Sequence, residues 1–116
     1  MVDQPWFLNT AIEVSTEAEP AALLEICLNI EKENHRTRQI FKGPRTLDMD
    51  ILFYGSRIIH QPGLTIPHSS LAARRFVLAP LAEIAPDFVH PVTGQTIREL
   101  LQSCPDHSAV QIVGTL

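Results

Sequence analysis

The chain has 116 residues, a hydrophobic fraction of 45% and a formal net charge of −4 at pH 7. This length predicts one small domain over residues 1–116, with enough apolar side chains for a real core. The acidic balance argues against nucleic-acid binding, and no apolar run approaches the roughly 18 residues that span a membrane. No signal-peptide pattern opens the chain and the two cysteines make no disulfide framework, so we expect a cytoplasmic protein.

The first half of the sequence predicts a strand, a helix, a loop and a hairpin. Alternating residues at 7–14 favour a strand, and a helix with an apolar stripe that includes Cys27 is expected to begin near Pro20 and end near Asn34. The basic segment 35–46 lacks an apolar period and favours a mobile loop. Residues 47–54 have the strongest strand pattern, and Gly55-Ser56 predicts a tight turn into a hairpin with residues 57–59.

The second half is broken by prolines and predicts shorter elements. We expect loops at 60–69 and 85–95, a short helix at 70–74, an extended piece at 76–78, a helical turn at 80–84, a helix at 96–103 and a last strand at 110–113. Ile97, Leu100 and Leu101 should form the buried side of the helix at 96–103. The order of elements points to an α+β fold with a mainly antiparallel sheet.

The segment at 47–54 carries the clearest chemical pattern. Asp48 and Asp50 are two residues apart, so a strand would place both carboxylates on one face. Two like charges on a largely buried strand repel one another, and a hard cation such as Mg²⁺ would relieve that repulsion. The alternative is an exposed strand face with solvated aspartates.

Arginines surround this carboxylate pair in the sequence. Arg45 lies three residues before Asp48, and Arg36 and Arg38 lie further upstream. They could form simple salt bridges, or they could neutralise a triphosphate whose metal ions the aspartates hold. Because the chain has no GxxxxGK[ST] loop, the second alternative would depend on guanidinium groups for phosphate binding.

Aromatic and polar residues elsewhere suggest a site for a flat heterocycle. Phe7 and Asn9 would share a strand face, as would Arg74 and Phe76 if that segment is extended. An aromatic ring beside an amide suits stacking and hydrogen bonding to such a ligand. Phe76 could equally be a core residue, and His68, which follows Ile66-Pro67, could be a surface histidine.

Four ordered segments resemble one enzyme family. Residues 43–52, GPRTLDMDIL, resemble the GPRTLDLDIL signature of the 6-hydroxymethyl-7,8-dihydropterin pyrophosphokinases. QPWFLN at 4–9, LTIPH at 64–68 and RRFVLAPL at 74–81 are similar to further segments of that family. The resemblance covers most of the chain. It implies an enzyme of folate biosynthesis that transfers a diphosphate from ATP to a pterin alcohol and releases AMP.

The resemblance also implies a role for each matching residue. Asp48 and Asp50 would hold two Mg²⁺ ions and, with Arg38 and Arg45, would be the catalytic residues. The residues implied to contact ATP are Glu31, Arg36, Arg38, Arg45, Ile51, Leu64, Thr65, His68 and Arg74. Phe7 and Phe76 would sandwich the pterin, and Asn9 would read its polar edge.

The family's fold is a ferredoxin-like α/β sandwich, and this sequence departs from it in two places. Lys42 stands where many members have a tryptophan, and the chain opens three residues before Gln4, without the family's first strand, helix and second strand. We therefore expect a truncated form that self-associates through an exposed sheet edge and turns over little by itself. The alternative function is a non-catalytic relative that binds ATP and Mg²⁺.

Overall fold

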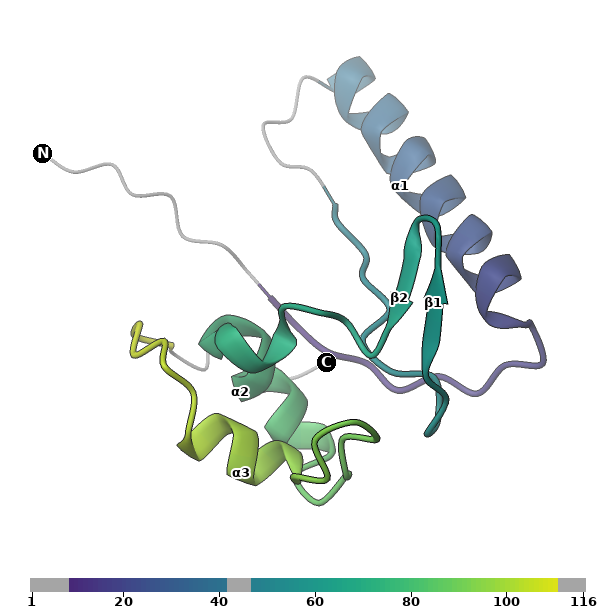
Figure 1. The fold of residues 1–116 in the computed structure, drawn as a ribbon. Helices are drawn as coiled ribbons and strands as arrows, with labels where there is room; N and C mark the ends of the chain where they lie inside the picture. The colour runs from purple at the N-terminus through teal and green to yellow at the C-terminus, as the bar shows by residue number, and fades with distance from the viewer. Residues whose placement is uncertain (1–8, 42–46, 111–116) are drawn as a thin grey trace, which may run out of the picture. The chain divides into compact units, whose positions relative to one another are not determined.

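The computed structural model describes the backbone of residues 9–41 and 47–110, and the side chains of residues 9–36 and 47–110. The elements in chain order are α1 (Pro20–Phe41), β1 (Ile59–Gln61), β2 (Leu64–Ile66), the 3-10 helix η1 (Leu71–Ala73), α2 (Arg75–Ile84) and α3 (Ile97–Gln102) (Figure 1). The predicted α+β class is confirmed, with a two-stranded antiparallel sheet in the described part of the chain.

The chain forms two compact units. The hairpin unit is Ser15–His68 and contains α1, β1 and β2. The helical unit combines Met1–Val14 with Ser69–Leu116 and contains η1, α2 and α3. Across the described ranges, no helix has both the length and the apolar character needed to cross a membrane.

Helix α1 begins at Pro20, as predicted, but continues past Asn34 to Phe41. The prediction of a loop is therefore wrong for residues 35–41, while residues 42–46 lie outside the described part. Glutamate, lysine, arginine and glutamine are good helix formers even without an apolar stripe, which explains the longer helix. Cys27 is buried, as expected, and burial together with the nearby charge of Glu31 raises the pKa of its thiol.

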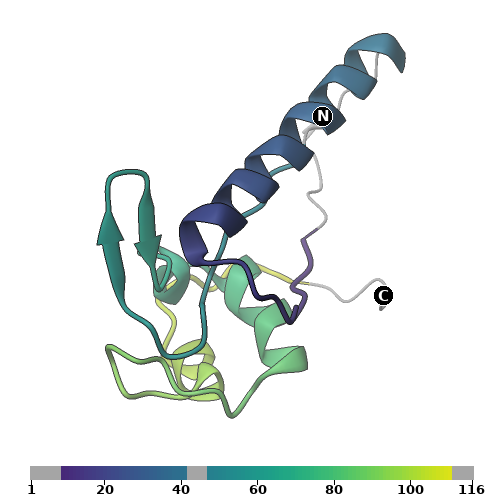
Figure 2. The same ribbon diagram turned by 90° about the vertical axis from the view of Figure 1, so that its right-hand side faces the viewer.

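Strands β1 and β2 form a hairpin where the sequence predicted a loop. Ile59 lies opposite Ile66, and the turn between the strands contains Gly63 at φ 78° (Figure 2). Pro62 lies in that turn and Pro67 follows β2, so neither proline removes a donor from the ladder. The unit's core cluster joins strand and helix residues: Ile59, Leu64 and Ile66, with Leu24, Ile51 and Tyr54 packed against them.

The strands predicted at 7–14 and 47–54 are wrong for the described residues. Neither 9–14 nor 47–54 belongs to a strand ladder. The turn at Gly55-Ser56 is confirmed by a hydrogen bond of 3.1 Å from Arg57 N to Tyr54 O, but it does not close the predicted hairpin.

The helical unit is built from short helices around a compact core. The short helix at 70–74 is confirmed as η1, whereas the extended piece predicted at 76–78 is wrong because those residues belong to α2. Pro80 lies inside α2, and the buried side chains of Leu78 and Leu81 hold this helix in place. No strand includes Val110, the last described residue, and residues 111–113 of the predicted last strand lie outside the described part.

Helix α3 confirms the prediction for 96–103 and has a complete capping box. The Thr96 side chain accepts from Glu99 N, and the Glu99 carboxylate accepts from Thr96 N. Ile97 and Leu100 are buried, while Leu101 is half-buried.

A tight turn before α3 is organised by the buried His90. Its Nδ1 accepts from Val92 N at 3.1 Å and from Thr93 N at 3.2 Å, so this nitrogen carries no proton. Burial lowers the pKa of His90, in agreement with that role as an acceptor.

Candidate functional site

The two aspartates of the family-like segment are both exposed at the surface of the hairpin unit. Asp48 and Asp50 are exposed, while the intervening Met49 and the following Ile51 are half-buried. Exposed and half-buried side chains therefore alternate over residues 48–51, but Leu47 is also exposed and the segment is not paired as a strand. Exposed carboxylates can be reached by a solvated cation.

Glu31 attaches this segment to α1. Its Oε2 accepts from Met49 N at 2.5 Å, and Met49 lies between the two aspartates. Because an ionised acceptor makes a strong hydrogen bond, the contact fixes the backbone from which both aspartates project. The resemblance implied that Glu31 contacts the nucleotide, whereas here it accepts a hydrogen bond from the carboxylate segment itself.

His68 lies beside Asp50 although the two are far apart in sequence. His68 N donates to Leu52 O at 2.9 Å, which holds the end of the hairpin against the carboxylate segment. His68 Nε2 is then 4.0 Å from Asp50 Oδ1, close enough for attraction when the imidazole is protonated. The His68 side chain is 26% exposed and that of Asp50 is 61% exposed, so both remain accessible.

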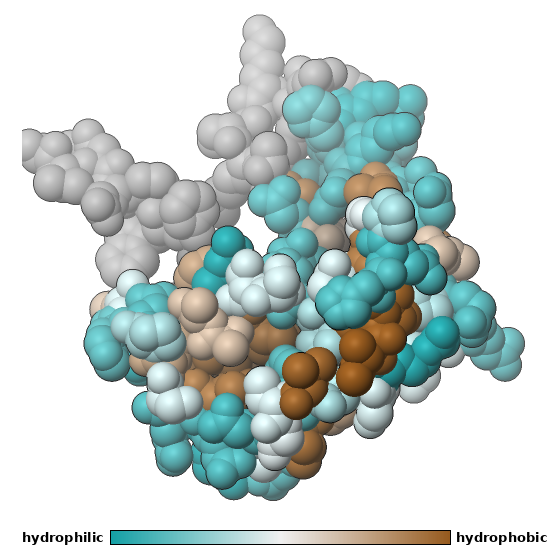
Figure 3. All heavy atoms as spheres, in the orientation of Figure 1, coloured by the Kyte–Doolittle hydropathy of each residue, from teal (hydrophilic) through white to brown (hydrophobic). Residues whose placement is uncertain are grey.

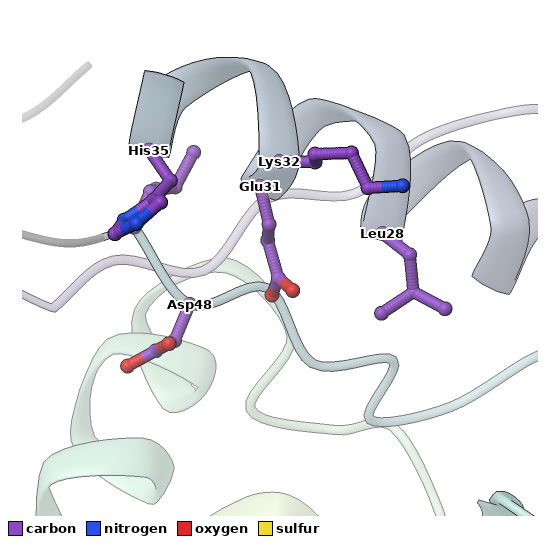
Figure 4. Close-up of a pocket in the computed structure, with 6 residues that line it drawn as sticks. Leu28, Glu31, Lys32, His35 and Asp48 are labelled. Atoms are coloured by element: carbon purple, nitrogen blue, oxygen red, sulfur yellow. The ribbon is translucent and has the colours of Figure 1, made fainter. Parts of the chain in front are cut away.

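An open hollow of about 350 Å³ lies between α1 and the carboxylate segment. In Figure 4 the Glu31 side chain extends from α1 toward this segment, and the Asp48 carboxylate points away from the helix. The hollow combines carboxylates with cationic and apolar groups and is lined by Leu28, Glu31, Lys32, His35, Leu47 and Asp48. Such a lining can hold a polar ligand that also has an apolar part.

The sequence interpretation missed Lys32 and His35 as lining residues. With Leu28 and Glu31 they follow the i, i+3, i+4, i+7 spacing of one helix face. This helical spacing is visible in the sequence, but it includes His35 only if α1 continues past Asn34.

The predicted arginine clamp can be examined at Arg36. Its Nη2 lies 2.9 Å from Glu33 Oε1, and the two side chains are 72% and 66% exposed. Such a surface pair contributes little to stability, so the guanidinium is easily redirected to an anion. The side chain of Arg38 and all of Arg45 lie outside the described residues.

The residues expected beside adenine divide into core and surface. Ile51 and Leu64 belong to the core cluster, and Leu64 is only 7% exposed. Thr65, between two buried residues of β2, is exposed. Of these three side chains, Thr65 therefore offers the most accessible surface to a ligand.

The remaining predicted residues belong to the helical unit. The Arg74 guanidinium lies 5.9 Å from the centre of the Phe76 ring, within cation–π range. Phe76 is 41% exposed, so it is not the core residue that the alternative interpretation assumed. Asn9 is also exposed, and Phe7 lies outside the described residues.

The donor set fits Mg²⁺ when a nucleotide supplies part of the coordination. No group of three or more histidine, cysteine, aspartate or glutamate side chains within residues 9–36 and 47–110 could hold a metal ion. Mg²⁺ in nucleotide sites takes one or two carboxylates and completes its shell with phosphate oxygens and waters. Asp48 and Asp50 meet that smaller requirement.

Comparison with known proteins identifies the family. Residues 1–86 match the model of 7,8-dihydro-6-hydroxymethylpterin-pyrophosphokinase (HPPK). The chain is 48% identical, over 85% of its length, to a 2-amino-4-hydroxy-6-hydroxymethyldihydropteridine pyrophosphokinase of Methylorubrum extorquens, and it spans 61% of that protein. A protein of the same name from Pseudomonas aeruginosa is 42% identical over 97% of the chain, which spans 68% of it.

A third relative is much longer. The folic acid synthesis protein fol1 of Schizosaccharomyces pombe is 45% identical over 89% of the chain, which spans only 14% of that protein. The match of the family model to residues 1–86 nevertheless covers most of the chain and includes the segment with Asp48 and Asp50. The chain therefore belongs to the 7,8-dihydro-6-hydroxymethylpterin-pyrophosphokinase family.

Proposed function

We propose that this chain takes part in the transfer of a diphosphate from ATP to 6-hydroxymethyl-7,8-dihydropterin in folate biosynthesis. The observation that carries the proposal is the segment at 47–50, where two exposed aspartates flank a backbone N–H bound by Glu31 and where His68 lies beside Asp50. The relatives matched over most of the chain include proteins named as pyrophosphokinases.

The reaction requires one bond to form and one to break. The pterin hydroxyl oxygen attacks the β-phosphorus of ATP, the bond from that phosphorus to the oxygen of AMP breaks, and the hydroxyl proton is released. Negative charge develops on the phosphoryl oxygens and on the departing AMP. Catalysis therefore depends on positioning and on positive charge around the phosphates.

Asp48 and Asp50 are the residues that would hold two Mg²⁺ ions, which neutralise phosphate charge when bound. Glu31 keeps the two carboxylates in place through Met49 N. The cationic residues that would contact the phosphates are Arg36, Arg38, Arg45, His68 and Arg74. Arg38 and Arg45 would act directly on the transferred group.

The substrate rings would be bound by separate groups of residues. Thr65, with the accessible edges of Ile51 and Leu64, would contact the adenine side. Phe7 and Phe76 would stack on the pterin, and Asn9 would bond its polar edge. The exposed Phe76 ring supports this assignment because an exposed aromatic face is available for stacking.

The finer fold is also a proposal. We propose a single domain over residues 1–116 that belongs to a ferredoxin-like sandwich. The exposure of Ile26, Leu28 and Ile30, each between 44% and 47%, supports further packing on α1 by additional strands or a second copy of the chain. The two free buried cysteines support a reducing compartment such as the cytoplasm.

The test is an assay of ATP conversion to AMP with the pterin, combined with calorimetry of ATP-analogue binding at varied Mg²⁺. Pterin-dependent AMP supports the enzyme. Mg²⁺-dependent nucleotide binding without AMP would instead support the alternative, a non-catalytic relative that binds ATP and Mg²⁺. Absence of both would reject the proposed function for this chain.

A further inference from the structure

The segment after α3 returns to the start of α2 within the helical unit. Asp106 Oδ2 accepts from the backbone N of Arg75 at 3.1 Å, across 31 positions in sequence. Asp106 Oδ1 accepts from Ser108 N at 2.9 Å and from Ser108 Oγ at 2.5 Å. One carboxylate thus links its own turn to the first residue of the helix.

Helix α2 lacks a local side-chain cap. Its N-cap residue is Arg74, whose side chain makes no capping hydrogen bond. Arginine carries donors only, so it cannot satisfy the first N–H groups of a helix. Asp106 supplies the missing acceptor from a distant part of the chain, and its negative charge also suits the positive end of the helix.

The helix start that Asp106 holds carries two proposed substrate contacts. Arg74 is the N-cap residue, its carbonyl accepts from Val77 N and Leu78 N at 3.1 Å each, and its guanidinium lies over the Phe76 ring. A shift of the first turn would move Arg74 and Phe76 together. We propose that Asp106 is a positioning residue that fixes Arg74 and Phe76 for substrate binding, an inference that rests on the proposed function.

The charge state of Asp106 agrees with this role. Hydrogen bonds from the Ser108 side chain, from Ser108 N and from Arg75 N lower the pKa of the Asp106 carboxyl. The carboxylate is therefore ionised at neutral pH and remains an acceptor for the helix.

The test measures binding of α,β-methylene ATP with Mg²⁺ to four forms of the full chain: wild type, Asp106→Ala, Arg74→Ala and the double variant. Asp106→Ala should weaken binding about threefold to tenfold, the range expected when a helix cap is lost. The double variant should bind no more weakly than Arg74→Ala, since Asp106 acts through Arg74. Asp87→Ala is the matched control, because its carboxylate pairs with Arg98 at 2.7 Å in the same unit.

A structural measurement accompanies the binding assay. In wild type the NMR shift of the Arg75 amide should follow the titration of Asp106, and this dependence should disappear in Asp106→Ala. If Asp106→Ala does not fold, Ser108→Ala replaces it, with an expected weakening of about twofold because the Arg75 contact remains.

The outcomes separate this inference from the proposed function. Weakened binding in Arg74→Ala with wild-type binding in Asp106→Ala would overturn the inference alone. If Asp106→Ala weakened binding equally in wild type and in Arg74→Ala, this would also overturn the inference, since it would indicate a general structural effect. Wild-type binding in Arg74→Ala would reject the phosphate role of Arg74 and the inference together.

Discussion

The hairpin unit and the helical unit bury their apolar side chains to different extents. In the helical unit Leu71, Leu78 and Ile97 are at most 1% exposed, and the helices are secured by a capping box and by the acceptor groups of His90 and Asp106. In the hairpin unit α1 exposes Ile26, Leu28 and Ile30. On the face in Figure 3, brown apolar side chains gather near the hairpin.

This difference suggests a division of roles. The helical unit presents Arg74 and Phe76 from a helix start that Asp106 holds. The hairpin unit carries the exposed carboxylates and the hollow beside α1. Its helix α1 also has apolar residues on more than one side, and such a helix is typically covered by other elements on those sides. The hairpin unit therefore carries candidate site residues while part of the apolar surface of α1 is left uncovered.

The largest effect is expected at Asp50 in the hairpin unit. Asp50→Ala should reduce pterin-dependent AMP formation by on the order of a thousandfold, because a metal-holding charge is lost from the transition state. The free energy of unfolding should change by no more than about 0.5 kcal/mol, as for other exposed side chains. Rate assays and urea titrations measure the two quantities. An unfolded Asp50→Ala protein would favour a purely structural role for this aspartate.

A smaller effect is expected at Arg74 in the helical unit. Arg74→Ala should lower the rate of AMP formation by about a hundredfold, within the range for one preorganised donor. Arg57→Ala is the control, since Arg57 pairs with Glu19 at 3.3 Å and lies over the Tyr54 ring on the outside of the hairpin unit. Equal losses of rate at Arg57 and Arg74 would mean that general positive charge, and not a specific contact, determines activity.

Self-association should depend on the hairpin unit. Replacing Ile26 and Ile30 together by glutamate should weaken association of the chain by about tenfold or more, because both side chains lose apolar burial. Light scattering over a concentration series measures this. Val92→Glu is the control, since Val92 is an exposed apolar side chain of the helical unit, at 62%. A monomeric wild type at all concentrations would reject the prediction.

The smallest effect concerns pH and the turn at His90. Burial lowers the pKa of His90 from its ordinary value of 6.5, so the unfolded chain takes up a proton first as the pH falls. The free energy of unfolding should decrease from about pH 7 through 6.5 and level off below the lowered pKa. Thermal melts between pH 5 and 7.5 should show this slope in wild type and in His107→Gln, but a reduced slope in His90→Asn. An unchanged slope in His90→Asn would assign the pH dependence to another group.

Local signals in the sequence were sufficient for several elements. Pro20 predicted the start of α1, and the apolar period ending near Ser103 predicted α3. The hairpin at 59–66 was missed because Pro62 was interpreted as a strand breaker, although it lies in the turn. The helical turn predicted at 80–84 lies within α2, but the first part of this helix was missed, because its acceptor Asp106 lies 31 positions away and no local pattern reports such a contact.

The sequence motif predicted which residues form the candidate site better than it predicted their contacts. The spacing of Asp48 and Asp50 predicted a shared strand face, but the strand did not form and both aspartates are exposed, as in the alternative interpretation. The contacts of Asp50 with His68 and of Glu31 with Met49 N depend on tertiary packing between distant segments. Nothing in the sequence alone predicted them.

The most direct test of the account is to find which residues lie next to the metal when nucleotide is bound. Mn²⁺ substituted for Mg²⁺ in the presence of α,β-methylene ATP should broaden the amide resonances of residues 47–51 and of His68, and Asp48→Asn with Asp50→Asn should abolish that broadening. Broadening that is absent from residues 47–51, or that persists unchanged in the double variant, would contradict the assignment of Asp48 and Asp50 as the metal-holding residues.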